Sequence, residues 1–259
     1  MRWIMSGIVV TVSAVIAAPV AAGEPDRTCT AVLGGQWARG DGVCRGALTS
    51  ERAATMDLSV RLPDDLLESP MAGAVITPYL SELVGGWRQI GKSMPRDSDY
   101  SADYQRFSRG PLTSVVFEER WQTVGAPPNR AYRTFTFDMV NGRQLQLADL
   151  FRPEVDPLTA LPPLVRPFLI PALDQAAPPH DPGTYPFAAQ EWEPQPDRSG
   201  YSGDYRAFAV TEDALVLYLP DAPMAHENPW PRDRFVWSMD GGTVTVRVPL
   251  TALASILAI

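Results

Sequence analysis

The sequence has 259 residues and a formal net charge of -8, with 45% apolar and 20% charged residues. This length and composition suit a globular protein with a real hydrophobic core, whereas an acidic surface repels phosphate groups and excludes nucleic-acid binding through a basic face. The 26 prolines predict many loops and interrupted elements rather than long helices.

Residues 1–22 have the layout of a secretory signal peptide. Arg2 precedes an apolar run from Ile4 to Ala18, and Val20-Ala21-Ala22 offers small residues to a signal peptidase. The alternative is an uncleaved anchor, but the run is shorter than the ~20 apolar residues of a comfortable span. We expect cleavage after Ala22 and a secreted, extracellular protein, since no later stretch has the length and apolarity of a membrane span.

The chain has two cysteines, Cys29 and Cys44, and both follow the predicted leader. In an exported chain the natural interpretation is one structural disulfide, which closes the Gly-rich segment between them. A metal site on the two cysteines is the alternative, yet His180 and His226 lie far along the chain. We expect a disulfide and no metal or other cofactor.

Residues 23–110 are expected to hold the disulfide, a strand and a helix. Alternating apolar residues from Met56 to Leu62 predict the strand. The helix is predicted to start with Thr77 as N-cap and Pro78 as first helical residue. Its apolar stripe has helical spacing: Leu80, Leu83, Val84, Trp87 and Ile90. The aspartates of 97–103 lack the glycine and terminal glutamate of an EF-hand, so we expect a solvated loop there.

The clearest β-hairpin lies in the middle of the chain. Phe135 and Phe137 alternate with threonines, and the alternation resumes at Leu145 and Leu147 after an Asn-Gly turn signal. A two-residue turn would mix apolar and polar residues on each face. A three-residue loop with a left-handed Gly142 would instead pair Phe137 with Leu145 and Phe135 with Leu147 on one face, and we predict this register.

Predicted strands and proline-rich segments make up the rest of the chain. Within residues 156–175 a helix is predicted to begin near Pro163 and to be broken by Pro167 and Pro171, and 176–203 is expected to be a long surface loop. Further strands are predicted over 112–121, 205–210, 214–219 and 243–248, the second and third forming a hairpin.

The order of these motifs resembles that of a known family. The stretch YRTFTFDMVNGRQLQLADLF is followed by DPL, then by DYRAFAVTEDALVLYLP and VRVPLTAL. This order resembles the mycobacterial secreted immunogenic protein family, which is related to the C-terminal extracellular domain of the lysozyme-sensing anti-sigma factor RsiV. The resemblance covers most of the mature chain, from about Thr28 to Leu253.

The resemblance implies an α+β fold, with an antiparallel β-sheet packed by helices and a β-grasp-like element in the C-terminal half. It implies that residues 111–259 form an RsiV-like domain, in one globular unit with residues 23–110. Two loops depart from the family: Pro127 stands where members often carry a histidine, and the segment between Leu219 and Thr243 is longer. The family supplies no catalytic residues to transfer.

No catalytic constellation indicates a reaction. The serine-hydrolase elbow G-x-S-x-G is absent, and Ser202 lies only in a near miss. Glu118 and Glu119 are adjacent in a strand and so point to opposite faces. Glu191 and Glu193 flank a tryptophan in a predicted extended segment. One interpretation is a surface on which a glycan stacks, and the alternative is a solvated acidic loop. We expect a non-enzymatic protein, and the alternative is a cell-wall-associated glycan hydrolase that uses a carboxylate such as Glu191.

Four loop aromatics are the candidate binding residues: Trp192, Tyr201, Trp230 and Trp237. Exposed rings supply a large contact area at low entropic cost, so we expect a monomeric recognition protein. Its partner would be an unknown protein or a cell-wall glycan, and an acidic module suits a basic protein such as lysozyme. The alternative is that these rings cover the protein's own core.

Overall fold

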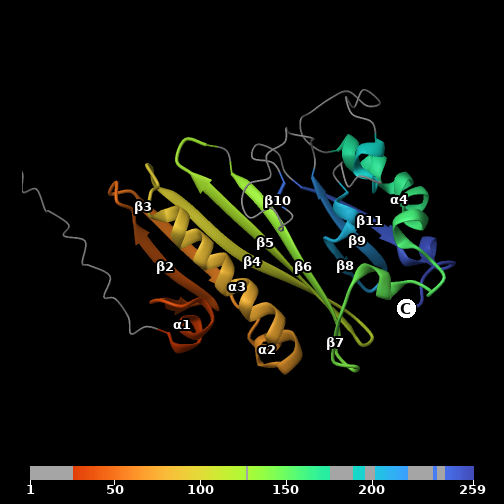
Figure 1. Ribbon diagram of the computed structural model, residues 1–259, viewed down its shortest axis with the longest axis horizontal. Coiled ribbons are helices and arrows are strands. Elements are labelled where there is room, and N and C mark those ends of the chain that lie inside the picture. The colour runs from red at the N-terminus through yellow and green to blue at the C-terminus, as the bar shows by residue number, and fades with distance from the viewer. Residues whose placement is uncertain (1–25, 127, 176–188, 196–201, 221–235, 238–242) are drawn as a thin grey trace, which may run out of the picture.

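The structure is a computed structural model that describes residues 26–126, 128–175, 189–195, 202–220, 236–237 and 243–259. The predicted signal peptide lies outside these residues and stays a prediction. The described part has an α+β fold, as predicted, in which two β-sheets and two long helices form successive layers (Figure 1).

The larger sheet contains eight described strands in the order β1-β2-β3-β4-β5-β6-β10, and β7 also pairs with β6. The strands are β1 (Ala38–Gly40), β2 (Val43–Thr49), β3 (Thr55–Arg61), β4 (Ser98–Arg109), β5 (Leu112–Thr123), β6 (Asn129–Asp138), β7 (Arg143–Leu145) and β10 (Val236–Trp237). Neighbouring strands are antiparallel except β3 and β4, which are parallel. A parallel pair needs a long crossover, and the helices α2 (Asp64–Glu68) and α3 (Pro70–Gly91) supply it.

The smaller sheet is antiparallel and has the described strand order β11-β9-β8. It consists of β8 (Phe208–Val210), β9 (Ala214–Pro220) and β11 (Thr243–Pro249), which confirms the second predicted hairpin and the final strand. The helix α4 (Pro157–Asp174) packs against β11. This sheet and α4 lie in the C-terminal half, where a β-grasp-like element was expected. The pairs β11–β9 and β8–β9 are both antiparallel.

Three apolar clusters hold these layers together. The first lies between α3 and the large sheet and is rich in aromatic rings, the second lies between the small sheet and α4, and the third joins the two sheets. β9 is buried on both faces, which explains its unbroken apolar sequence. Leu215, Leu217 and Leu219 belong to the second cluster, whereas Val216 and Tyr218 belong to the third.

Short elements complete the fold. The first helix, α1 (Arg27–Leu33), carries Cys29, and the structure confirms the predicted disulfide with Cys44 of β2. The described residues further along the chain include four short 3-10 helices: η1 (Leu147–Leu150), η2 (Ala189–Trp192), η3 (Gly203–Tyr205) and η4 (Leu250–Leu253). The division expected between residues 110 and 111 falls in the turn between β4 and β5, so the two portions share the large sheet.

The start of α3 was predicted wrongly. Ser69 is the N-cap and accepts a hydrogen bond from the Ala72 N–H at 3.4 Å, while Pro70 is the first helical residue. Ser69 and Pro70 therefore form the N-cap and the first helical position, the roles that were predicted for Thr77 and Pro78. Pro78 lies inside the helix on its exposed side, where water can bond the carbonyl that lacks a donor. The predicted stripe is buried except Ile90, which is 38% exposed.

Replacing Gly85 or Gly86 by alanine is expected to raise the free energy of unfolding by about 1 kcal/mol each, because glycine is a poor helix former. Both lie inside α3, and no atom is within 4 Å of the position that a Cβ would take. Denaturant unfolding measures the gain. Gly73→Ala is the control, since its Cβ would collide with the Leu67 carbonyl oxygen, and it should lose stability. A loss in the first two variants would contradict the prediction.

The aspartate-rich residues 97–103 are not a loop. From Ser98 onward they form the start of β4, in which Ser98, Tyr100 and Ala102 are buried and alternate with exposed or partly exposed positions. The Asp97 carboxylate accepts the Thr55 N–H at 2.7 Å and so fixes the beginning of the strand. The aspartates occupy the other face, which concealed the alternation in the sequence.

The helix α4 is continuous, although its prolines predicted a break. Asp156 caps its N-terminus, and Pro163, Pro167 and Pro171 recur every four residues on the exposed side. The opposite side carries the buried stripe of Leu161, Val165, Leu169 and Leu173. Each proline removes one backbone hydrogen bond, but on this side water can bond the freed carbonyl. The apolar stripe keeps the helix in place.

The hairpin of β6 and β7 forms, but its register differs from the predicted one by one residue. Phe137 pairs with Gln144 and Thr136 pairs with Leu145, so residues 139–142 form the loop. Gly142 is left-handed, with φ of 63°, as predicted. The prediction assumed a single apolar face, whereas β6 is buried on both sides. Phe137 belongs to the cluster under α3, and Leu145 belongs to the cluster of the small sheet and α4.

The Asp138 side chain explains the longer loop. Its carboxylate accepts hydrogen bonds from the N–H groups of Val140 at 3.2 Å and Asn141 at 2.9 Å, and from the Asn141 side-chain amide at 2.6 Å. The hydrogen bonds from Asn141, foremost that of its side chain, hold the pKa of Asp138 below its ordinary value. The ionised carboxylate therefore closes the turn.

Candidate functional site

A cleft of about 400 Å³ lies between the two sheets, on the face of the large sheet that α3 does not cover. The large sheet contributes Asp103, Gln105 and Phe107 from β4, Val116 and Glu118 from β5, and Tyr132 from β6. The small sheet contributes Val216 and Tyr218 from β9, with Thr245 and Arg247 from β11. Alternation along each strand places these side chains on the facing surfaces of the two sheets.

Hydrogen bonds from the edge of β8 fix the end of the cleft where the sheets meet. The Val210 N–H donates to the Ser114 hydroxyl at 2.9 Å, and the Phe208 N–H donates to the Thr134 hydroxyl at 3.1 Å. Ser114 and Thr136 are buried and lie 2.8 Å apart, hydroxyl to hydroxyl. Hydroxyl side chains of the large sheet thus satisfy an edge strand that would otherwise expose donors.

Two stacked tyrosines join the sheets inside the cleft. The rings of Tyr132 and Tyr218 have centroids 4.9 Å apart and an interplanar angle of 19°. Tyr218 is only 6% exposed and lines the cleft. Burial, followed by the charge of Glu118, raises the pKa of Tyr132. Burial also raises the pKa of Tyr218 to about 12, so both phenols are neutral at physiological pH.

The raised pKa of Tyr218 predicts a loss of stability in alkali. Its ordinary pKa is 10.0 and its folded-state pKa is about 12. Because its pKa is higher in the folded state, the neutral phenol of Tyr218 contributes to stability in full below the unfolded-state pKa. This contribution is lost as the pH rises from about 10 through about 12. Over that pH range, the free energy of unfolding of the Tyr218→Phe variant should therefore fall by about 2 kcal/mol less than that of the parent. Denaturant unfolding at a series of alkaline pH values tests this, and parallel curves for the two proteins would contradict it.

The charged groups of the cleft occur as acid–base pairs. Asp103 and Glu118 are directly opposite on β4 and β5. Each has an arginine partner: Arg61 Nε lies 2.9 Å from Asp103, and Arg130 Nε lies 3.5 Å from Glu118. The two like charges are neighbours on one face, and the two guanidinium groups offset their repulsion.

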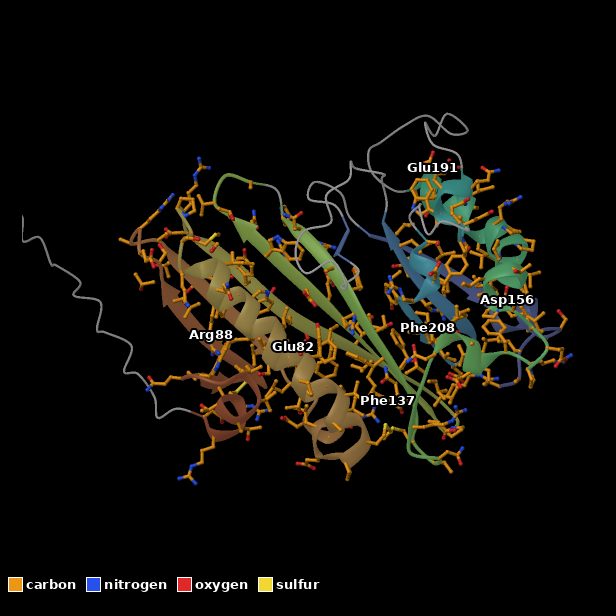
Figure 2. All side chains as sticks on the ribbon, in the orientation of Figure 1. Glu82, Arg88, Phe137, Asp156, Glu191 and Phe208 are labelled. Atoms are coloured by element: carbon orange, nitrogen blue, oxygen red, sulfur yellow. A yellow bond between two sulfur atoms is a disulfide. The ribbon has the colours of Figure 1, made fainter. Side chains whose placement is uncertain are left out.

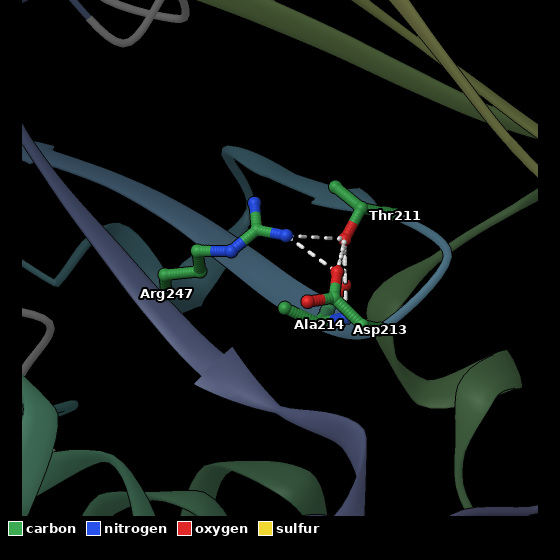
Figure 3. Close-up of polar contacts among 4 residues, drawn as sticks. All are labelled: Thr211, Asp213, Ala214 and Arg247. Carbon is green, nitrogen blue, oxygen red and sulfur yellow. Dashed lines mark hydrogen bonds and ion pairs between the residues drawn. The ribbon is translucent and has the colours of Figure 1, made fainter.

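Arg247 is held by the turn between β8 and β9 (Figure 3). Its guanidinium donates to the Asp213 carboxylate and, at 3.4 Å, to the Thr211 hydroxyl. The Thr211 hydroxyl accepts the Ala214 N–H at 3.0 Å and lies 3.0 Å from Asp213. The hydrogen bond from Thr211, followed by the charge of Arg247, holds the pKa of Asp213 below its ordinary value. Thr211 and Asp213 thus hold the Arg247 side chain in place at the cleft, and the Asp213 carboxylate offsets its charge.

Two of the four predicted binding aromatics, Trp192 and Trp237, lie among the described residues. Trp192 lies in η2 and is 0% exposed within the cluster of the small sheet and α4, so its role as an exposed anchor is wrong. Its indole packs where a partner cannot reach. Tyr201 and Trp230 lie outside the described residues. Trp237 belongs by its backbone to β10 and pairs with Arg130.

The predicted carboxylate pair around Trp192 is also corrected. The segment forms the 3-10 helix η2 and its end rather than an extended strand, because Trp192 turns inward. Glu193 is buried and accepts two hydrogen bonds from Arg166 of α4, at 2.7 and 2.9 Å. Glu191 lies beside α4 (Figure 2), away from the cleft. The two glutamates therefore do not flank a shared glycan surface.

Glu118 and Glu119 point to opposite faces, as predicted. Glu118 lines the cleft, whereas Glu119 is buried under α3 and accepts the Tyr79 hydroxyl at 2.9 Å. A smaller pocket of about 250 Å³ lies on that other face, where Glu82 of α3 (Figure 2) and Gln144 of β7 are among its lining residues.

Sequence reasoning missed most of the residues that form the cleft. Tyr132 and Tyr218 lie in strands that were predicted correctly, but only the packing of two sheets places their rings face to face. Asp103 was assigned to a solvated loop, so its position opposite Glu118 was not foreseen. The one available signal was β9, whose unbroken apolar run indicates burial on both faces.

The described residues contain no group of three or more His, Cys, Asp or Glu side chains placed to hold a metal ion, and His180 and His226 lie outside them. None of the helices in the described part has the length and apolarity needed to cross a membrane.

The described chain is thus an α+β protein with a large, mainly antiparallel sheet packed by helices and an inter-sheet cleft. Among solved structures it is similar to two described as DUF3298 family proteins. One is from Pseudomonas aeruginosa PAO1 (15% identity, 83% of this chain and 93% of that chain covered, TM-score 0.46). The other is from Bacteroides fragilis NCTC 9343 (16% identity, 84% and 92% covered, TM-score 0.44). No family model and no curated protein matches the sequence.

Proposed function

We propose that the protein is a secreted recognition protein of the mycobacterial immunogenic and RsiV-like type, which binds a host or cell-wall partner without transforming it. The observation that carries the proposal is the inter-sheet cleft. It combines the stacked rings of Tyr132 and Tyr218 with charged and polar side chains from both sheets. Concave sites with apolar walls and a few placed polar groups are typical of ligand binding.

Secretion is supported by two features. The sequence begins with a predicted signal peptide over 1–22, and Cys29 and Cys44 form a disulfide. Disulfides persist in oxidising compartments and are rare in the cytosol. We propose that the mature chain, residues 23–259, acts outside the cell as a monomer.

The test is capture by the immobilised mature chain from host secretions and cell-wall fragments, with lysozyme added as a separate sample. The cleft variant combines Gln105→Ala with Glu118→Gln. The matched control combines Gln144→Ala with Glu82→Gln in the pocket on the other face. We expect the parent and the control to retain the same partner and the cleft variant to retain at least tenfold less. Equal retention by all three folded proteins, or retention by none, would refute the proposal.

A second candidate, a cell-wall-associated glycan hydrolase, is favoured by one observation: Asp103 and Glu118 are opposite each other in the cleft. Cross-strand neighbours have Cβ atoms about 5 Å apart, and paired carboxylates are the usual equipment of glycosidases. Release of reducing ends from cell-wall glycan, abolished by Glu118→Gln and by Asp103→Asn, would support this function. If the parent releases none, the hydrolase is excluded.

A further inference from the structure

We propose that the ligand of the inter-sheet cleft is an uncharged carbohydrate, bound through the Tyr132–Tyr218 pair and the polar groups around it. This inference rests on the proposed recognition function, because it names the chemical class that the same cleft takes. Three features of the described residues support it: the balance of charge, the mixture of donors and acceptors, and the aromatic surface.

The charges around the cleft compensate one another. Asp103 has Arg61, Glu118 has Arg130, and Arg247 has Asp213 as partner. A charged ligand would therefore compete with an existing ion pair, so its net electrostatic gain would be small. An uncharged ligand can bond the unused lone pairs and N–H groups while every pair stays intact.

The polar groups of the cleft match a ligand with many hydroxyls. A sugar hydroxyl both donates and accepts, and here carboxylates accept, a guanidinium donates, and the Gln105 amide and the Thr245 hydroxyl are suited to either role. Tyr218 is the central element, because it lines the cleft and its ring stacks on that of Tyr132. Its phenol hydroxyl can both donate and accept a hydrogen bond, which is what a ligand hydroxyl requires.

The apolar surface of the cleft suits the C–H face of a sugar ring. Tyr132 and Phe107 are half-buried, and together with Val116 they leave ring and methyl surface at the cleft. A cleft of about 400 Å³ lies in the range of small-ligand sites. Rings that are stacked and buried lose little further freedom on binding, so the surface is prepared before the ligand arrives.

The test is calorimetric titration of the mature chain with uncharged oligomers of N-acetylglucosamine, glucose, mannose and arabinose. We expect at least one to bind, with a dissociation constant that changes less than about twofold between about 0.05 M and about 0.5 M salt, since an uncharged ligand is not screened. Tyr218→Phe removes one hydroxyl and should weaken binding about tenfold. Tyr100→Phe, at a buried tyrosine on the face covered by α3, should leave binding unchanged.

Several results would overturn the inference. No binding of any uncharged oligomer, or equal weakening by Tyr218→Phe and Tyr100→Phe, contradicts it. Salt-sensitive capture of lysozyme through the cleft, without sugar binding, also contradicts it, yet leaves the recognition function standing. Failure of the capture experiment together with failure of the sugar titration removes both proposals.

Discussion

Replacing Phe117 by alanine is expected to lower the free energy of unfolding by about 4 kcal/mol. Phe117 of β5 is fully buried at the centre of the cluster under α3. Its ring lies 5.1 Å from Tyr79, 5.8 Å from Tyr104 and 6.2 Å from Phe135, centroid to centroid. Alanine would leave a cavity that three other rings line, and rings fixed by neighbouring strands and a helix cannot easily collapse into it.

Denaturant unfolding measures this loss, and Phe107→Ala provides the matched control. Phe107 is a phenylalanine of the same sheet, but it is half-buried and lines the cleft on the other face. Its replacement removes less buried surface, so a loss of about 1 kcal/mol is expected. Equal losses in the two variants would show that the aromatic cluster under α3 is not the main source of stability in the large sheet.

Removing the disulfide is expected to lower the free energy of unfolding by about 3 kcal/mol. Cys29 and Cys44 are separated by 15 residues, and the chain-entropy model gives about that value for a loop of this length. Both cysteines are buried in the apolar cluster that includes Leu33 and Trp37, so replacement by alanine also removes apolar contacts. The bond therefore acts on the unfolded chain and anchors α1 to β2 in the folded one.

The disulfide prediction is measured by unfolding the parent with and without a reducing agent, and by unfolding the double variant Cys29→Ala/Cys44→Ala. The double variant should lose at least as much as the reduced parent, because alanine also removes apolar contacts, and it should not respond to the reducing agent. A loss below about 1 kcal/mol in both would indicate that other contacts of α1 suffice. One such contact is Arg88, whose guanidinium donates to the carbonyl oxygens of Leu33 and Gly34 at the end of this helix.

Predictions from local pattern succeeded where one face of an element is buried. In β3 the alternation of Met56, Leu58 and Val60 predicts the observed strand, because one side meets α3 and the other is more open. The hairpin of β8 and β9 was likewise predicted from its apolar runs and the polar turn at 211–213.

Prediction from local pattern failed where a strand is buried on both faces. It also failed where water can bond the backbone groups that prolines leave without a partner in a helix. The register of β6 and β7 was wrong by one residue because Phe137 and Leu145 enter different cores. The prolines of α4 predicted a break because the sequence does not show that Pro163, Pro167 and Pro171 would all face water. Trp192 was taken as exposed because a tryptophan among polar residues gives no sign of which way it turns.

The sequence by itself determined the α+β fold class, the disulfide and most of the strands, because these depend on spacing between residues close together in the chain. Only the tertiary structure decided the candidate site. Asp103, Tyr132, Tyr218 and Arg247 come from four strands distributed over more than half of the chain. The order and register of those strands, together with the packing of one sheet on the other, bring the four side chains to one cleft. Packing of this kind depends on contacts between distant segments, which local periodicity does not encode.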